Sequence, residues 1–477
     1  MKSFKKKSPG IILAATTLFI LFQIPYLSES KAQAPSTKAT EEAQPAGTPD
    51  NQSDRPDGPS LSDRLKNPWP WLSLGADFRL RWEYQFDVFT LNSGLPEHEY
   101  SYQRYRMRAW AKIHPVEQLD FNIRLTSEPR TYLKPDRMSG YVSDEFIVDS
   151  LNMVWRKVAD QPMTLTVGRQ EIILGNGWLV LEGTPLDGSR TLFFDAARMT
   201  YTLASRKTTV DLIGISQSSS SERWVSPLYD QHKPLVEQNE NGAILYVTNK
   251  ALPQTQIDGY FIYKHDTRVL LRGDNGDIYA FGGRIEGNIN NHWKYRAEFA
   301  PEVGNKNGQD LKAFGSNSRL SYNLKNRTNQ SLRIGYEYLS GDDPATKGTD
   351  EGFDPLWGRW PQWSELLLYN FNTETRVGYW SNLHRLDFGW SCNPANRMEL
   401  NADYMPLFAA SNPFQNRPGF SQDGKFRGNF ASALVRYKFN EHLSGHLLGE
   451  LFFPGDYYSS VKQDPATFLR AEFIVAW

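Results

Sequence analysis

One feature constrains the fold of this 477-residue chain more than any other: apolar and polar residues alternate with a period of two from Leu72 to the last residue. Successive side chains of a strand point to opposite faces, so this period predicts strands with one apolar and one polar face. We count eighteen such runs, near residues 72–86, 100–114, 118–127, 146–158, 162–173, 191–203, 208–216, 241–250, 254–265, 277–290, 293–304, 310–324, 330–341, 380–391, 397–408, 425–439, 442–454 and 466–477.

The composition favours a barrel in a membrane over a soluble sandwich. Aromatic residues make up 13% of the chain, yet its mean hydropathy is −0.56. After the first 30 residues no stretch holds the ~20 apolar residues that a transmembrane helix requires. We therefore predict an all-β fold, a transmembrane antiparallel up-and-down β-barrel of about eighteen strands, with short periplasmic turns and long outer loops. Tight turns are expected near 114–118, 290–293 and 440–442, and long connections at 87–99, 128–145, 174–190, 217–240 and 342–379.

The N-terminus predicts export from the cytoplasm. A lysine-rich start, an apolar run at 11–24 and the small-x-small signature Ala32-Gln33-Ala34 are typical of a secretory signal peptide. We divide the chain into a signal peptide (1–34), a disordered Pro/Ala-rich linker (35–70) and an outer-membrane barrel (71–477). The predicted location is the outer membrane of a Gram-negative-type bacterium. No plug domain precedes the barrel, so the loop 342–379 is the candidate for folding inward.

The C-terminal strand is the sharpest single signal. Residues 468–477 alternate up to a terminal aromatic, Trp477. Such an ending resembles the signal that the barrel assembly machinery reads, so this machinery and outer-membrane lipids are expected partners. Trp69 and Trp71 precede the first strand and suit a membrane interface.

Charge and cysteine content exclude several classes. The net charge is −1, and it becomes −5 without the first 34 residues, which carry a net +4. We therefore expect no nucleic-acid partner. The single cysteine, Cys392, excludes an intramolecular disulfide and multi-cysteine zinc sites, and we predict no metal and no cofactor.

Strand parity assigns the polar face to the barrel interior, because a lysine or arginine facing lipid at mid-bilayer costs about 2–4 kcal/mol. That face holds nineteen basic and thirteen acidic residues, which predicts an arginine-rich lumen. Fourteen arginines are candidate pore-lining, anion-binding residues: Arg79, Arg81, Arg104, Arg106, Arg108, Arg124, Arg156, Arg198, Arg296, Arg319, Arg333, Arg385, Arg436 and Arg470.

Arg104, Arg106 and Arg108 form a ladder on one strand, and Arg79 and Arg81 extend it on the next. Two interpretations remain open. The arginines can pair with carboxylates in a network that stiffens a wide barrel, or they can line a path for an anionic solute. The structural role is favoured for any single residue, and both roles can coexist along the wall.

Two motifs carry a family resemblance. The first reads Gly168-Arg169-Gln170-Glu171 and continues to Phe194-Asp195 and Ala197-Arg198, and the second reads Gly335-Tyr336-Glu337-Tyr338 with Phe353-Asp354-Pro355-Leu356 downstream. The chain resembles the alginate export family of outer-membrane barrels over roughly 72–477. The resemblance implies an eighteen-stranded monomeric barrel that passively exports the polyuronate alginate through an Arg-rich pore. Trp178-Leu179 stands where the family usually has Arg-Leu.

The first motif also predicts a loop anchor. Regular alternation would aim Arg169 and Asp195 at lipid, so we predict that a bulge near Gly168 or Gly175 turns them inward. The expected result is a polar cluster that fixes the loop 174–190 at the pore mouth, formed by Arg169, Glu171, Arg190 and Asp195.

Enzymatic readings have weak support, and we predict that the chain is not an enzyme. Neither GxSxG nor HExxH occurs. His442 and His446 would share a metal only on a helix, and they begin a predicted strand. The sequence therefore predicts a passive channel for an anionic carbohydrate or another anionic solute. A general porin for small solutes is the alternative, and a barrel enzyme, marked by a histidine bonded to a serine, is a weaker one.

Overall fold

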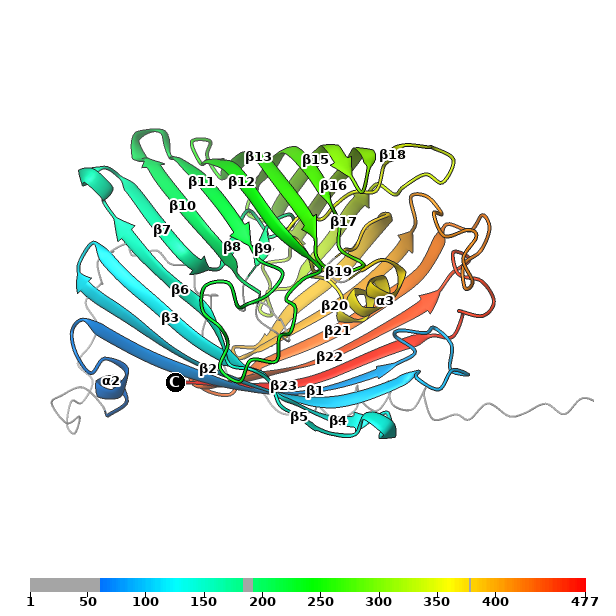
Figure 1. Ribbon diagram of the computed structural model, residues 1–477, viewed down its shortest axis with the longest axis horizontal. Coiled ribbons are helices and arrows are strands. Elements are labelled where there is room, and N and C mark those ends of the chain that lie inside the picture. Colours follow the sequence, from blue (N-terminus) through cyan, green and yellow to red (C-terminus); the bar gives the residue numbers. More distant parts are fainter. Residues whose placement is uncertain (1–60, 183–191, 377–378) are drawn as a thin grey trace, which may run out of the picture.

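The computed structural model describes residues 61–182, 192–376 and 379–477, and eighteen of its strands form one closed antiparallel barrel (Figure 1). Each barrel strand pairs with its neighbour along the chain, and β1 pairs with β23 to close the sheet. All eighteen runs predicted from the sequence are barrel strands. Their bounds are β1 Leu72–Phe86, β2 Glu99–Val116, β3 Leu119–Ser127, β6 Ile147–Arg156, β7 Met163–Gln170, β10 Phe194–Leu203, β11 Thr208–Gln217, β12 Gln238–Asn249, β13 Thr255–Arg268, β14 Gly276–Asn288, β15 Trp293–Lys306, β16 Gln309–Asn323, β17 Ser331–Leu339, β19 Leu383–Ala395, β20 Met398–Phe408, β21 Phe426–Lys438, β22 Leu443–Pro454 and β23 Ala466–Ala476.

Short and long connections alternate around the barrel, which fixes its orientation. One end carries short turns such as 289–292 and 439–442, together with the start of β1 and the end of β23. Asn290 and Asn440 shape these two turns, because each side-chain oxygen accepts backbone N–H groups two and three residues ahead. Short turns mark the periplasmic end of an outer-membrane barrel. The two-residue connection 307–308 is the exception among the connections at the opposite end.

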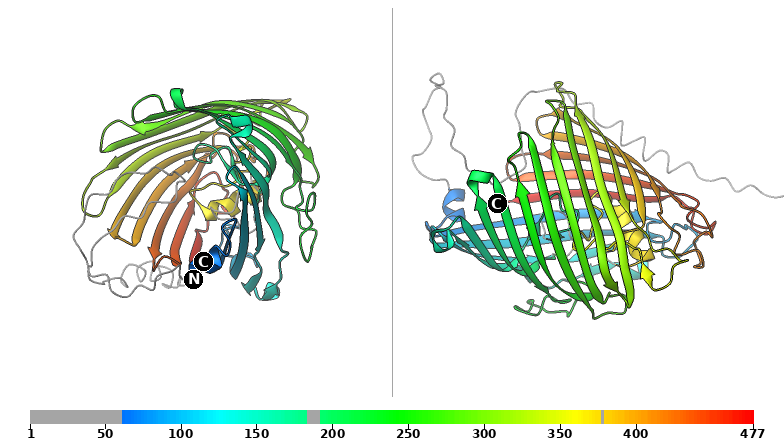
Figure 2. Two further views of the ribbon diagram at one scale, coloured as in Figure 1. Left: turned by 90° about the vertical axis from the view of Figure 1, so that its left-hand side faces the viewer. Right: turned by 90° about the horizontal axis from the view of Figure 1, so that it is seen from above.

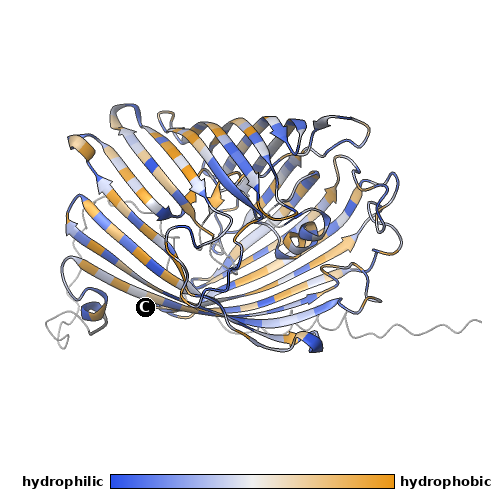
Figure 3. Cartoon of the chain, in the orientation of Figure 1, coloured by the Kyte–Doolittle hydropathy of each residue, from blue (hydrophilic) through white to orange (hydrophobic). Residues whose placement is uncertain are grey.

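The two faces of the wall follow the sequence alternation. On β1, Phe78 is 41% exposed on the outer face, whereas Arg79 and Arg81 are buried on the inner face. Apolar and polar residues alternate along the strands in the same way around the barrel (Figure 3). On β23, Phe473 and Val475 point outward as predicted. No helix within the described residues is long and apolar enough to cross a membrane.

Shorter elements lie between the barrel strands. They are the helices α2 Leu61–Lys66 and α3 Glu365–Glu374, the strands β4 Arg130–Lys134, β5 Gly140–Val142, β8 Ile172–Ile173, β9 Leu181–Glu182 and β18 Thr349–Asp350, and the 3-10 turns Asp136–Met138, Val158–Asp160 and Ala204–Arg206. The signal peptide prediction and the linker up to residue 60 lie outside the described residues. The last part of the predicted linker is not structureless, because residues 61–66 form the helix α2. After this helix, the rings of Trp69 and Trp71 stack with their centroids 5.4 Å apart.

Two connections fold into the barrel and build a hydrophobic core there. We call residues 171–182 and 340–376, which include α3, the plug; Figure 2 shows α3 inside the ring of strands. Trp357, Phe353 and Leu366 of the plug are buried against inward-facing residues of the wall such as Ile213 and Ile262. The prediction that the loop 342–379 folds inward is therefore correct for its described part. Parity alone was too simple here, since part of the inner face that the plug covers is apolar, as at Ile213 and Ile262.

Candidate functional site

A wall of guanidinium groups lies where β1, β2 and β23 meet. We call Arg79, Arg81, Arg104, Arg106, Arg108 and Arg470 the arginine wall. The register places Arg79 opposite Arg106 and Arg81 opposite Arg104. Like charges directly opposite each other destabilise a sheet, so this arrangement requires compensation.

Three buried carboxylates supply most of that compensation. Glu83 accepts hydrogen bonds from Arg104 Nη1 at 2.9 Å and from Arg470 Nε at 3.0 Å. Glu128 accepts from Arg79 Nη2 at 2.6 Å and Arg104 Nε at 2.5 Å. Glu472 accepts from Arg81 Nε at 2.6 Å. Each carboxylate thus bridges guanidinium groups, and the wall is a crosslinked network of charge-assisted hydrogen bonds.

Arg106 has the weakest compensation in the wall. Its nearest carboxylate oxygen is Oδ1 of Asp77, 3.7 Å from Nη2, and that carboxylate also pairs with Arg108. Nε and Nη1 of Arg106 are buried without a hydrogen-bond partner among the described residues. The periplasmic end of the wall therefore carries a surplus of positive charge.

The other predicted arginines also have polar partners on the inner face. Arg385 donates to Glu337 at 2.9 Å, and Arg319 and Arg333 share Asp387. The remaining pairs are Arg124 with Asp149, Arg156 with Asp120, Arg198 with Asp211, Arg296 with Asn317 and Arg436 with Glu399. Carboxylates from loops and from the plug, which the parity analysis did not count, offset much of the predicted basic surplus; among them are Glu128, Glu365 and Asp354.

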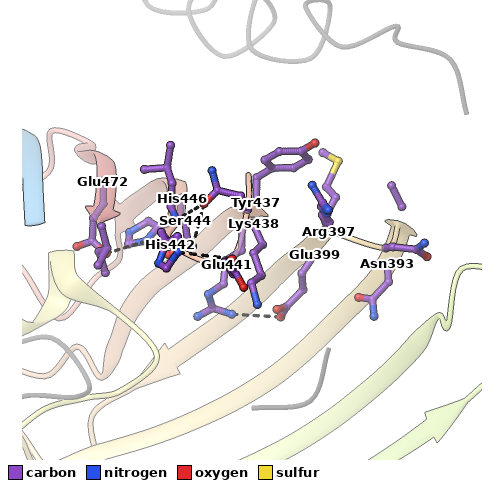
Figure 4. Close-up of a pocket in the computed structure, with 18 of the residues that line it drawn as sticks. Asn393, Arg397, Glu399, Tyr437, Lys438, Glu441, His442, Ser444, His446 and Glu472 are labelled. Carbon is purple, nitrogen blue, oxygen red and sulfur yellow. Dashed lines mark hydrogen bonds and ion pairs between the residues drawn. The ribbon is translucent and has the colours of Figure 1, made fainter. Parts of the chain in front are cut away.

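Two pockets open on the inner wall toward the periplasmic end. The β19–β23 pocket has a volume of about 1050 Å³ and a mixed lining (Figure 4). Its basic residues face Glu399, Glu441 and Glu472, and Glu472 contacts His446 Nδ1 at 3.3 Å. The mixed charge gives this pocket no strong preference for one sign of solute.

The β1–β10 pocket lies on the other side of the seam where β1 pairs with β23, and it has a volume of about 670 Å³. Among the residues that line it, Arg108, Lys112, Arg124 and Arg198 are basic and only Glu171 is acidic. Each of these cations pairs with a carboxylate buried behind the pocket surface: Arg108 with Asp77, Lys112 with Asp120, Arg124 with Asp149 and Arg198 with Asp211. The surface that the pocket presents to the lumen is therefore basic, although its charges are largely compensated from behind.

The two family motifs meet inside the plug. Trp178 donates its indole N–H to Glu337 at 2.9 Å and stacks on Phe353 with ring centroids 5.7 Å apart. The backbones also pair, since the Trp357 N–H donates to the Leu179 carbonyl at 3.0 Å. Trp178, one of the departures from the family pattern, therefore joins both inward loops to the wall.

A buried charge cluster anchors the plug to β13 and β15. Asp354 accepts from Lys306 Nζ at 2.9 Å, and its backbone N–H donates to Glu302 at 2.8 Å. Burial alone would raise the pKa of Asp354, but the charges of Lys306 and Lys264 hold that pKa well below its usual range. Carboxylate oxygens of Asp354, Asp266 and Asp274 converge as in a cation site, but these lysine ammonium groups already neutralise them.

Both ends of α3 are fixed by charged groups of the barrel. Glu450 of β22 accepts the backbone N–H groups of Glu365 and Leu366, so a carboxylate caps the positive end of the helix. At the other end, Glu374 receives Arg427 Nη1 at 2.8 Å. The sequence analysis did not predict these anchors.

The predicted loop anchor is divided between two places. Arg169 and Asp195 form an ion pair at 3.1 Å, but both strands keep a regular register and no bulge turns them inward. They remain on the outer face, where the ring of Phe193 and the carbonyl of Ser221 cover Arg169. The predicted inward turn is therefore wrong. Arg169 can face outward because Asp195, Phe193 and the Ser221 carbonyl surround its guanidinium group and keep it away from lipid. Glu171 lies on the inner face with Arg124, and Arg190 lies outside the described residues.

In the part of the chain that the structure describes, the histidine side chains have carboxylate, hydroxyl or backbone carbonyl groups as their partners. No hydrogen bond there joins a histidine to a serine. His114, His265 and His446 contact carboxylates, and His384 pairs with the hydroxyl of Tyr336 at 2.7 Å.

The closed eighteen-stranded barrel, its apolar outer face and its charged lumen define an outer-membrane β-barrel channel. Within that class, the chain belongs to the alginate export family, whose sequence pattern matches residues 70–471.

Solved structures show the same fold at low sequence identity. OpdO of Pseudomonas aeruginosa is 11% identical, with a TM-score of 0.56 over 85% of this chain and 97% of that chain. OccAB2 of Acinetobacter baumannii is 9% identical, with a TM-score of 0.53 over 85% and 98%. OprD of Pseudomonas aeruginosa is 8% identical, with a TM-score of 0.51 over 85% and 95%. A comparison with curated proteins finds no match.

Proposed function

We propose that this channel, in the outer membrane of a Gram-negative-type bacterium, passes anionic solutes by passive diffusion and that its substrates are uronate-type oligo- or polysaccharides. The observation that carries the proposal is the lining of the β1–β10 pocket, which presents four basic residues and one acidic residue to the lumen while the carboxylates that pair with these cations lie buried behind them. Guanidinium groups bind carboxylates in a bidentate manner, and a lumen lined by one sign of charge concentrates the opposite sign. Membership in the alginate export family supports the uronate class.

The remaining expectations follow from the same picture. The proposed channel performs no catalysis and needs no cofactor. Its proposed partners are outer-membrane lipids and the barrel assembly machinery, which would recognise β23 with its terminal Trp477.

Neutralising Arg108 and Lys112 together tests the anion preference. Both residues line the pocket. Their carboxylate partners, Asp77 and Asp120, each keep a second basic partner in the variant: Asp77 still pairs with Arg106, and Asp120 still pairs with Arg156. We expect anion selectivity in the wild type and a reversal potential shifted toward cation selectivity in the R108Q/K112Q variant. The measurement is the reversal potential of the mature chain in a planar bilayer across a KCl gradient.

A matched control removes the same charge elsewhere. Lys157 and Lys207 lie in periplasmic turns, and the K157Q/K207Q variant should keep the wild-type reversal potential. Titration with polymannuronate and with a neutral oligosaccharide then tests the substrate class. A cation-selective pore, or one that polymannuronate does not block, would contradict the proposal and favour a general porin.

A further inference from the structure

The β1–β10 pocket contains one aromatic side chain among its charged and polar residues, Trp110 of β2. Strand alternation places Trp110 on the inner face between Arg108 and Lys112. The register sets it opposite Gly75 on β1 and Arg124 on β3. An indole ring therefore lies in the lumen with a cationic side chain on three sides.

Gly75 shapes the position of this ring. A Cβ atom built on Gly75 would lie 2.4 Å from two ring carbons of Trp110, so the indole occupies the space that any other side chain would take. Trp110 therefore lies against the backbone of β1, and glycine at position 75 leaves the room for this contact. The ring thus packs against the wall, with its other side toward the pocket.

The N–H group and one face of the indole are available to a ligand. Among the described residues, no hydrogen bond uses its N–H group, and no other ring stacks on it. Neighbouring polar side chains are held in place, since Asn122 donates to Asn152 at 2.9 Å and Asn152 donates to Ser150 at 3.0 Å. The cations are fixed as well, because Arg124 is held by Asp149 and Arg198 by Asp211.

From this arrangement we infer that Trp110 is the stacking platform of a pyranose subsite at the periplasmic end of the lumen. The C–H face of a sugar ring lies on the indole, the ring carboxylate pairs with Arg108 or Arg124, and hydroxyl groups meet the amides of Asn122 and Asn152. An aromatic face with charged and hydroxyl-binding groups around it suits a uronic acid sugar better than a small inorganic anion. The inference rests on the proposed function and extends it from charge to the recognition of a sugar ring.

Replacing Trp110 by alanine separates the recognition of a sugar ring from the attraction of an anion by charge. In planar bilayers we expect hexamannuronate to block the W110A channel about five- to tenfold more weakly than the wild type, the loss expected for one aromatic stacking partner. Hexaglutamate, which has carboxylates but no sugar ring, should block both channels equally. The reversal potential in a KCl gradient should be unchanged, because no charge is removed.

Two further variants complete the design. Trp155 of β6 is an outward-facing tryptophan, 42% exposed, and W155A should behave as the wild type. In G75A the added methyl group displaces the indole but leaves it in the chain, so this variant should weaken hexamannuronate block without a change in hexaglutamate block.

Equal block of wild type and W110A by hexamannuronate, with anion selectivity intact, would overturn the subsite and leave the proposed function standing. Block by hexaglutamate weakened as much as block by hexamannuronate would also overturn it, since Trp110 would then act on the wall and not on a sugar. A wild-type channel that lacks anion selectivity and that neither polyanion blocks would refute the proposed function itself.

Discussion

Replacing Glu83 by glutamine is expected to destabilise the barrel by about 3–5 kcal/mol, the cost of leaving a buried charge without its partner. Glu83 is fully buried and contacts Arg81, Arg104 and Arg470. Glutamine keeps the volume of the side chain, so the loss isolates the charge from packing. The measurement is the free energy of unfolding in urea, followed by tryptophan fluorescence in lipid vesicles.

A second pair on the same inner wall supplies the control. Glu399 and Arg436 form an ion pair whose side chains are 43% and 55% exposed. Water screens such a pair, so E399Q should cost no more than about 1 kcal/mol. Equal losses in E83Q and E399Q would mean that the arginine wall is hydrated and that its guanidinium groups do not depend on Glu83.

The strands and their faces could be predicted from the sequence because lipid imposes a local rule. Every second residue of a strand must be apolar, so a run such as 72–86 reveals both its secondary structure and its orientation. The same rule placed Arg79, Arg81 and Arg104 on one inner surface before any pairing was known. Local period and a uniform solvent are sufficient for this part of the fold.

The alternation rule fails where another part of the chain, and not lipid or lumenal water, covers a face of a strand. Ile213 faces inward because the plug covers it, and Arg169 faces outward because Phe193 and Ser221 cover it. Both contacts join segments far apart in the sequence, so no local pattern records them. A run with apolar residues on both faces, as in 212–215, is the signal that predicts a covered inner face.

The residues that anchor the plug could not be predicted from the sequence either. Glu450 caps α3 and Asp354 binds Lys306, and each pair joins a strand to a loop that returns into the lumen. The motif containing Asp354 was recognised, but its role depends on where the loop folds. Trp110 was missed because a tryptophan on a polar face is a single departure from alternation.

Replacing Asp354 by alanine is expected to release the plug and to raise the single-channel conductance several-fold. The Asp354 side chain is fully buried, and without it Lys264 and Lys306 lose the carboxylate that they share. The hydrogen bond from the backbone N–H of residue 354 to Glu302 then remains without the ion pair to Lys306 beside it. A buried ion pair broken on one side costs about 3–5 kcal/mol, which is enough to open a loop whose docking is a local equilibrium. The eighteen strands pair independently of this loop, so the barrel itself should persist.

The control for this variant is Asp343, an exposed residue at the start of the same inward connection, whose carboxylate only shapes its own turn. D343A should keep the wild-type conductance. Far-ultraviolet circular dichroism and electrophoretic mobility before and after heating should be the same for both variants and the wild type, because the strands are untouched. If D354A conducts as the wild type does while its strands remain intact, the aromatic contacts of Trp178 and Trp357 hold the plug without Asp354, and the charge cluster serves the wall alone.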